Sequence, residues 1–161
     1  MRFDVTQTIA ATPQEVAEAY ASAELYEVLT GSDRLGPPEV LSREQDGRNV
    51  TLRIRYQFIA DLSPAVTAVV DPDRLTWVEQ SVHDLDALTV SVRLHPDHYV
   101  DRLRCSGTYR YAPEGAGTVR RIEGELKVKA LLVAGAVEKA IVSGLSEHLT
   151  VEAQAVEEYL S

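Results

Sequence analysis

The sequence has little of what would cross-link it or anchor it in a membrane. Among 161 residues there is one cysteine, Cys105, so no internal disulfide can form and the chain fits a reducing compartment. No apolar stretch approaches the roughly 18 residues that a membrane span needs. Residues 1–9 alternate polar and apolar side chains and do not resemble a secretory leader. We therefore expect a cytoplasmic chain that folds around a core of its own.

Basic charge and chemical motifs are scarce as well. The chain has 16 Lys and Arg against 25 Asp and Glu, and the resulting net charge of -9 argues against binding nucleic acid or an anionic membrane surface. It has no glycine-rich phosphate loop, no Gly-x-Ser-x-Gly elbow, no Cys-x-x-Cys pair and no His-Glu-x-x-His helix. We therefore expect neither a cofactor nor a metal, and no motif names a reaction.

What is present is a regular succession of structural elements, which opens with a strand and two short helices. Residues 2–9 alternate as a strand. The segment Thr12-Pro13-Gln14-Glu15 combines a capping threonine, a proline at the first helical position and a capping-box glutamate. A second short helix begins at Ser22 and ends near Gly31.

Antiparallel strands fill the middle of the chain. After a strand from about Val40, Asp46-Gly47 predicts a hairpin turn, and residues 50–58 then alternate apolar and polar side chains without exception. Residues 62–70 fit either a short strand or a single helical turn. Four further strands are predicted at residues 74–83, 88–94, 102–111 and 121–128. Strands of this kind bury one face only, so the sheet needs a cover.

The last thirty residues change period from two to 3.6 and supply that cover. From about Leu131 to Leu160 the apolar residues form one stripe along a long helix: Ala134, Val137, Ile141, Leu145, Leu149 and Val156. The order of elements predicts an α+β fold of the helix-grip type, a curved antiparallel sheet of about seven strands around a C-terminal helix. With no repeat or linker, residues 1–161 form a single predicted domain.

This order resembles the START-like superfamily (SRPBCC), which includes polyketide cyclases, the birch-pollen allergen proteins and lipid-transfer domains. Within it, three segments resemble an uncharacterised bacterial family: the opening strand with its Thr12-Pro13 helix start, residues 74–79 (RLTWVE) and residues 137–141 (VEKAI). The resemblance implies a cavity between sheet and helix that takes sterols, lipids, polyketides or plant hormones. It carries no catalytic residue over to this chain.

The residues themselves leave open whether the interior holds a cavity or only a packed core. Gly107 and Gly124 occupy inward strand positions, where glycine marks a bend or a close approach. The helix stripe is rich in small residues, and large fillers are few, with 2 Phe, 1 Trp and 1 Met. If the cavity exists, we expect its ligand-binding wall to consist of Tyr56, Phe58, Val90, Val92, Cys105, Tyr109, Leu126, Val137, Ile141 and Leu145.

Two constellations of histidine are candidates for chemistry. His148 and Glu152 lie four residues apart on the long helix and could act as a general base or bind a polar head group. The sequence favours a weak surface contact for this pair, at a helix end that overhangs the sheet. His95 and His98 could hold a metal, but Pro96 between them and the need for four structural ligands favour a solvated loop.

Two roles stay open for Gln7, and the other remaining polar residues are interpreted as structural. Gln7 lies on the inward face of the first strand, where it bonds a ligand or meets water near the strand end. Cys105 is interpreted as a small buried filler, and Arg120-Arg121 as part of a solvated sheet face. The strand at 74–83 does not reveal which of its faces turns inward. The strands with a clear alternation show no ionisable residue inside.

Three functions remain in competition. The first is a non-enzymatic carrier or sensor of an apolar small molecule such as a lipid, polyketide or sterol. The second is a cyclase or dehydratase-type enzyme that uses the same cavity, and the third is an interaction module with a closed core. The sequence favours the first over the second because an enzyme of this type should place ionisable residues inside. It leaves a homodimer open.

Overall fold

Seven strands form one antiparallel sheet in the order β1-β7-β6-β5-β4-β3-β2, so the first and last strands in sequence are neighbours. The computed structural model describes residues 1–161. The strands are β1 (Arg2–Ile9), β2 (Glu39–Asp46), β3 (Asn49–Gln57), β4 (Thr76–Asp84), β5 (Thr89–Pro96), β6 (Leu103–Glu114) and β7 (Gly117–Val128). The helices are α1 (Pro13–Tyr20), α2 (Ala23–Val28), α3 (Pro64–Thr67), the 3-10 turn η1 (Pro72–Arg74) and α4 (Ala134–Leu160).

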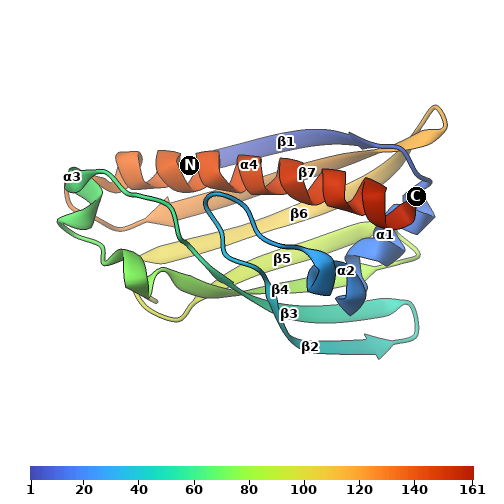
Figure 1. Ribbon diagram of the computed structural model, residues 1–161, viewed down its shortest axis with the longest axis horizontal. Helices are drawn as coiled ribbons and strands as arrows, with labels where there is room; N and C mark the ends of the chain where they lie inside the picture. The colour runs from blue at the N-terminus through green and yellow to red at the C-terminus, as the bar shows by residue number, and fades with distance from the viewer.

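The long helix α4 lies along one face of the sheet, and its principal contacts are with β1, β7 and α1 (Figure 1). The short helices α1 and α2 lie at the end of the molecule where α4 finishes, and α3 lies at the end where α4 begins (Figure 1). The predicted helix-grip fold is therefore confirmed. No helix, α4 included, is long and apolar enough to cross a bilayer.

Local sequence signals account for the element boundaries. In the capping box of α1, the Glu15 carboxylate accepts a hydrogen bond from the Thr12 amide at 3.0 Å, and the Thr12 hydroxyl accepts one from the Glu15 amide. The Ser22 hydroxyl caps α2 in the same way. Gly47 adopts a positive φ of 59° in the β2–β3 turn, as the Asp46-Gly47 signal predicts.

Residues 62–70 contain a helical turn, α3, and no strand, which is one of the two alternatives that the sequence left open. The structure departs from the prediction at two boundaries. The strand β5 continues through His95 and ends at Pro96, so the predicted loop there is shorter. The helix α4 begins at Ala134, because Leu132 takes a φ of 66°, which a helix cannot accommodate.

The two inward glycines do not leave the empty space that the sequence suggested. The ring of Phe3, on the neighbouring strand, lies directly over Gly124, so that a Cβ there would collide with it. At Gly107 a Cβ would lie 2.9 Å from the backbone oxygen of Glu123. Both glycines therefore allow the β1, β7 and β6 region to pack closely, and the interior space lies elsewhere.

Gly107→Ala should lower the free energy of unfolding by roughly 1–3 kcal/mol, because the backbone oxygen of Glu123 cannot move away from a methyl group without disturbing the sheet. The measurement is urea denaturation followed by circular dichroism. The matched control is Gly135→Ala in the first turn of α4, where a Cβ meets nothing within 4 Å. This control should be neutral or stabilising by up to about 1 kcal/mol. Equal stability of the two variants would contradict the close-packing role of Gly107.

Candidate functional site

An apolar cavity of about 130 Å³ lies between the sheet and the first half of α4. Its walls come from the inward faces of β1 and β3 to β7 and from one face of α4. Residues 62–70, which include α3, cover its end. The apolar side chains that line it include Tyr56, Phe58, Leu62, Val66, Val69, Trp77, Leu94, Cys105, Leu126, Val137, Ala140, Ile141 and Leu145. The only tryptophan of the chain thus contributes to the wall.

Seven of the ten predicted ligand-binding residues line this cavity: Tyr56, Phe58, Cys105, Leu126, Val137, Ile141 and Leu145. The other three do not. Val90 and Tyr109 border a much smaller polar gap deeper in the fold. Val92 is buried in the core. That the first seven contact a ligand stays a prediction.

The sequence missed the segment that closes the cavity. Leu62, Val66 and Val69 face the cavity from the long connection between β3 and β4. Their spacing of four and three residues places them on one face of a helix, and this spacing is the only feature of the sequence that could have identified them. A helical turn of this length is too short to be identified from its periodicity. The sequence therefore gave no reason to place these residues at the site.

The deep end of the cavity is polar, because Glu79 of β4 and His148 of α4 line both the apolar cavity and the smaller gap. Burial raises the pKa of Glu79 from 4.5 to about 7, and the nearby Glu152 charge adds to this rise. No hydrogen bond contributes to the shift. Glu79 borders the cavity as well as the smaller gap, so a molecule inside the cavity can reach this carboxyl group.

A buried charge network continues inward from His148. Its Nε2 lies 3.2 Å from Oε2 of Glu152, whose Oε1 accepts a hydrogen bond from Arg120 of β7, also at 3.2 Å. Burial alone would lower the pKa of His148, but the hydrogen bond and charge of Glu152 outweigh it and raise that pKa. Burial likewise disfavours a charged Glu152, yet His148 and Arg120 together hold the pKa of Glu152 below 4.5.

Aromatic rings and Gln7 complete the surroundings of Arg120. The guanidinium carbon lies 3.8 Å from the ring centroid of Tyr20 and 4.8 Å from that of Tyr109. Gln7 accepts a hydrogen bond from Arg120 at 3.2 Å and donates one to the backbone oxygen of Leu149. Gln7 therefore serves the interior network and ties β1 to α4.

Two interpretations of polar residues were wrong. Arg120 is 2 % exposed and points inward, although Arg121 beside it is exposed as predicted. His148 and Glu152 are 8 % and 5 % exposed and do not form a surface contact. Inward residues of β7 alternate with outward ones, and Arg120 lies two residues before the inward Ile122. The sequence pattern therefore did indicate that Arg120 points inward. A buried charge is tolerated only beside its partners, and those come from α4 and β1.

The inward face of β4, which the sequence left ambiguous, carries Trp77, Glu79, Ser81 and His83. The hydroxyl of Ser81 lies 3.0 Å from Nε2 of His83. Burial lowers the pKa of His83 to about 4, and the charge of Arg120 contributes, so this imidazole is neutral at about pH 7. The strand whose inward face was left open thus supplies two interior ionisable groups, Glu79 and His83. Among the strands with a clear alternation, the expectation of none fails at Arg120.

No further chemistry comes from Cys105, from His95 near the end of β5 or from His98 in the β5–β6 connection. Burial raises the pKa of the Cys105 thiol to about 12, which leaves it protonated and unreactive as a nucleophile. His95 and His98 are both exposed. His95 borders a hollow on the outer face of the sheet, whereas Nδ1 of His98 lies 3.5 Å from the Arg74 guanidinium.

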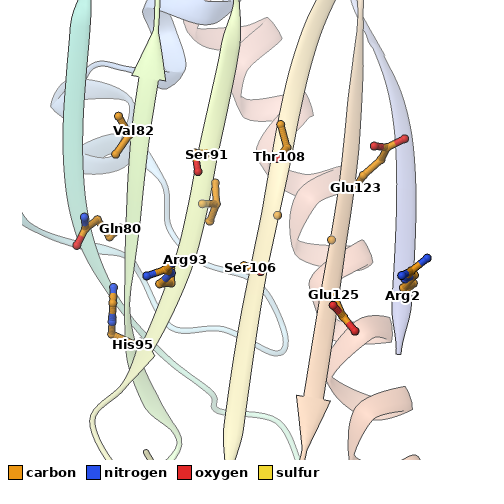
Figure 2. A pocket seen from close by; sticks show the side chains of 13 residues that line it. Arg2, Gln80, Val82, Ser91, Arg93, His95, Ser106, Thr108, Glu123 and Glu125 are labelled. Atoms are coloured by element: carbon orange, nitrogen blue, oxygen red, sulfur yellow. The ribbon is translucent and has the colours of Figure 1, made fainter.

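That outer hollow is larger, about 720 Å³, but it is an open depression on the face turned away from α4. Figure 2 shows the short side chains of Ser91, Ser106 and Thr108 along its middle, with Arg93 on one side and Glu123 on the other. All of these residues are exposed to solvent. We assign the candidate site to the inner cavity, because only there are titratable groups held away from water beside an apolar wall.

Comparison with known proteins places the chain among proteins of the same fold. Residues 4–160 match the family described as protein of unknown function (DUF2505). No curated protein matches the sequence. Solved structures share the helix-grip fold that the START-like resemblance implies, and three of them are described next.

The protein TTHA0849 from Thermus thermophilus has a TM-score of 0.69 and 18% identity, over 98% of this chain and 95% of that one. Norcoclaurine synthase from Thalictrum flavum has a TM-score of 0.65 and 18% identity, over 99% and 86% of the two chains. The Zhui aromatase/cyclase from a Streptomyces species has a TM-score of 0.60 and 16% identity, over 99% and 92%. At these identities the likeness is one of fold.

Glu79→Gln should stabilise the protein at alkaline pH. The folded-state pKa of about 7 lies above the unfolded value of 4.5, so the free energy of unfolding falls as the pH rises between these values. At about 1.4 kcal/mol per pKa unit, the variant should exceed the wild type by about 3 kcal/mol near pH 8 and match it near pH 4. Urea denaturation across pH measures this difference, and the exposed Glu123→Gln is the control. A constant offset at every pH would contradict the buried, proton-binding state of Glu79.

Proposed function

The chain belongs to the DUF2505 family, and we propose that it binds a small apolar molecule in the cavity between the sheet and α4. The observation that carries the proposal is the combination of an apolar wall with the unbonded Glu79 carboxyl group at its deep end. A pocket that is mostly apolar and has few convergent polar groups is the usual form of a small-molecule site.

The volume of the cavity limits what the resting protein can hold. About 130 Å³ is close to the size of an engineered apolar cavity of about 150 Å³ that binds benzene. One ring or a short alkyl group therefore fits without rearrangement. A larger ligand must extend beyond this cavity or displace residues 62–70, which cover its end. The tyrosine and tryptophan of the wall, Tyr56 and Trp77, stack at a centroid distance of 6.0 Å and suit a flat ligand.

A second candidate, acid–base catalysis on the bound molecule, is favoured by the titratable pair at the deep end. A carboxyl group whose pKa is about 7 exists in both protonation states at neutral pH, as a general base or acid requires. The rings of His148 and Tyr56 are roughly perpendicular with their centroids 5.3 Å apart, and the pKa of His148 is raised. Glu79 would take a proton from the ligand, and the imidazolium of His148 would stabilise the charge that results.

Proteins of similar fold support both candidates and do not favour one over the other. One is an aromatase/cyclase and another a norcoclaurine synthase, which has also been solved with dopamine and hydroxybenzaldehyde. Both ligands of the second protein are small aromatic molecules. The third alternative from the sequence, an interaction module with a closed core, has no comparable support, because the interior contains the cavity.

Native mass spectrometry of the protein purified from its own host tests the proposal directly. A co-purifying molecule with an apolar body identifies the ligand class. Trp77, the only tryptophan, lines the cavity, so its fluorescence should respond when that ligand is added back to protein from which it was removed.

Ile141→Trp should fill the cavity and abolish ligand binding, with the free energy of unfolding reduced by less than about 1.5 kcal/mol. The indole enters existing space, so little must move. The control is Val156→Trp on the same helix, at a fully buried position outside the cavity, which should destabilise by about 1–3 kcal/mol or more. Calorimetric titration and urea denaturation measure the two effects. If Ile141→Trp is as destabilising as the control, the region is a packed core and not a binding site.

Glu79→Gln also separates the carrier from the enzyme. If the bound molecule is chemically converted, the variant should lose about 10²–10⁴-fold in kcat and retain binding within a few-fold. The measurement is product formation by the two proteins under saturating ligand. An unchanged kcat would remove Glu79 from the chemistry, and a ligand that is released unaltered by the wild type would leave the carrier function alone.

A further inference from the structure

The outer part of the cavity is lined by a group of basic residues, Arg74, His98, Arg102 and Lys129, which we call the basic mouth. They come from three connections that meet at one end of the sheet, before β4, between β5 and β6, and after β7. Arg74 lies 3.5 Å from His98 and over the ring of Tyr99 at 5.8 Å. The backbone amide of Lys129 donates to the backbone oxygen of Arg102 at 2.7 Å. The basic mouth is therefore one continuous feature.

The cations of the basic mouth have no acidic partners. Arg74, Arg102 and Lys129 take part in none of the ion pairs of the structure. The only acidic residue that lines the cavity is Glu79, at the deep end. The whole chain has a net charge of -9, so acidic residues outnumber basic ones. Three unpaired cations around the opening of the cavity are therefore a local excess of positive charge in an acidic protein.

Acidic residues in the same connections do not neutralise this feature within the cavity. Asp71 uses its carboxylate to accept a hydrogen bond from the amide of Asp73, which caps η1. Asp97 forms an ion pair with Arg55. Asp61, Asp73 and Asp101 are exposed, and none of these four aspartates lines the cavity. The charge that a bound molecule meets at the opening is therefore positive.

We propose that the ligand is an amphiphile with an anionic head group, a carboxylate or a phosphate, which the basic mouth holds while the apolar body occupies the cavity. This inference rests on the proposed function and specifies its ligand class. The arrangement leaves the anion at an exposed opening, so binding does not require its full desolvation, and only the apolar part is removed from water.

The charge distribution also sets the orientation of the ligand. The deep cations, His148 and Arg120, are already paired with Glu152, and an ionised Glu79 repels a second negative charge there. The cations of the mouth are free. The head group therefore lies at the opening, and a hydroxyl or carbonyl group at the other end of the ligand would reach Glu79.

The test compares three probes that share one phenyl ring and differ in the end group: phenylpropionate, phenylpropanol and phenylpropylamine. Trp77 fluorescence and calorimetry measure the binding of each. The carboxylate should bind roughly tenfold tighter than the alcohol at low salt, and the amine should bind most weakly. The advantage of the carboxylate should shrink at about 0.5 M salt, because the head group is exposed to screening. Phenylpropyl phosphate, measured in the same way, shows whether a phosphate head group is preferred over a carboxylate.

Charge-removing variants locate the effect. Arg74→Gln and Arg102→Gln should each weaken carboxylate binding by roughly fivefold and leave alcohol binding unchanged, since one surface charge at contact distance is worth about that much. Arg110→Gln is the control, because it removes the same charge from an exposed position on the outer face of β6 that does not line the cavity. It should leave all three probes unaffected.

The outcomes separate this inference from the proposed function. If the alcohol binds as tightly as the carboxylate, or if Arg110→Gln has the same effect as the mouth variants, the anionic head group is refuted and the apolar binding site stands. If none of the probes binds to the wild type, the proposed function fails together with the inference drawn from it.

Discussion

The width of one helix relative to the sheet is the constraint on which this architecture depends. Seven strands at about 4.8 Å spacing are roughly 29 Å wide, whereas a helix with its side chains is about 10 Å across. Because α4 contacts chiefly β1 and β7, the inward faces of β3, β4 and β5 must be covered by other parts of the chain. The helices α1 and α2 do this at one end of the molecule, and residues 62–70 do it at the other.

Because different segments cover the two ends of the molecule, the interior differs between them. Where α1, β1 and the end of α4 meet, the interior holds Arg120 and Glu152 with nearly every charge paired, which makes the burial of charge tolerable. Where the cover is a single helical turn and a loop, packing is incomplete and an apolar cavity remains. Glu79 lies between the two regions, close enough to Glu152 to feel its charge and yet open to the cavity. The raised pKa of Glu79 follows from that position.

The patterns of single elements were sufficient for most of the fold and for part of the site. The alternation of residues 50–58 and the stripe of Val137, Ile141 and Leu145 correctly placed the wall that strand and helix share. They did not identify Glu79, because the inward face of β4 cannot be told from its own sequence. They missed Arg120 and the buried state of His148 as well. A charged residue in a sequence pattern is assigned to the solvent-exposed side unless its partner is known. The partner of both residues is Glu152, which lies 32 residues after Arg120 and four residues after His148.

The amino-acid sequence by itself determined the order of elements, the inward face of most strands and the helix that covers them, because periodicity and capping are local properties of the chain. Only the tertiary structure decided where space remains inside, which charges are buried together and which cations surround the opening. Those features depend on segments far apart in sequence meeting at one end of the sheet, as Arg74, Arg102 and Lys129 do. Cavities and charge networks are properties of such meetings, and no single segment encodes them.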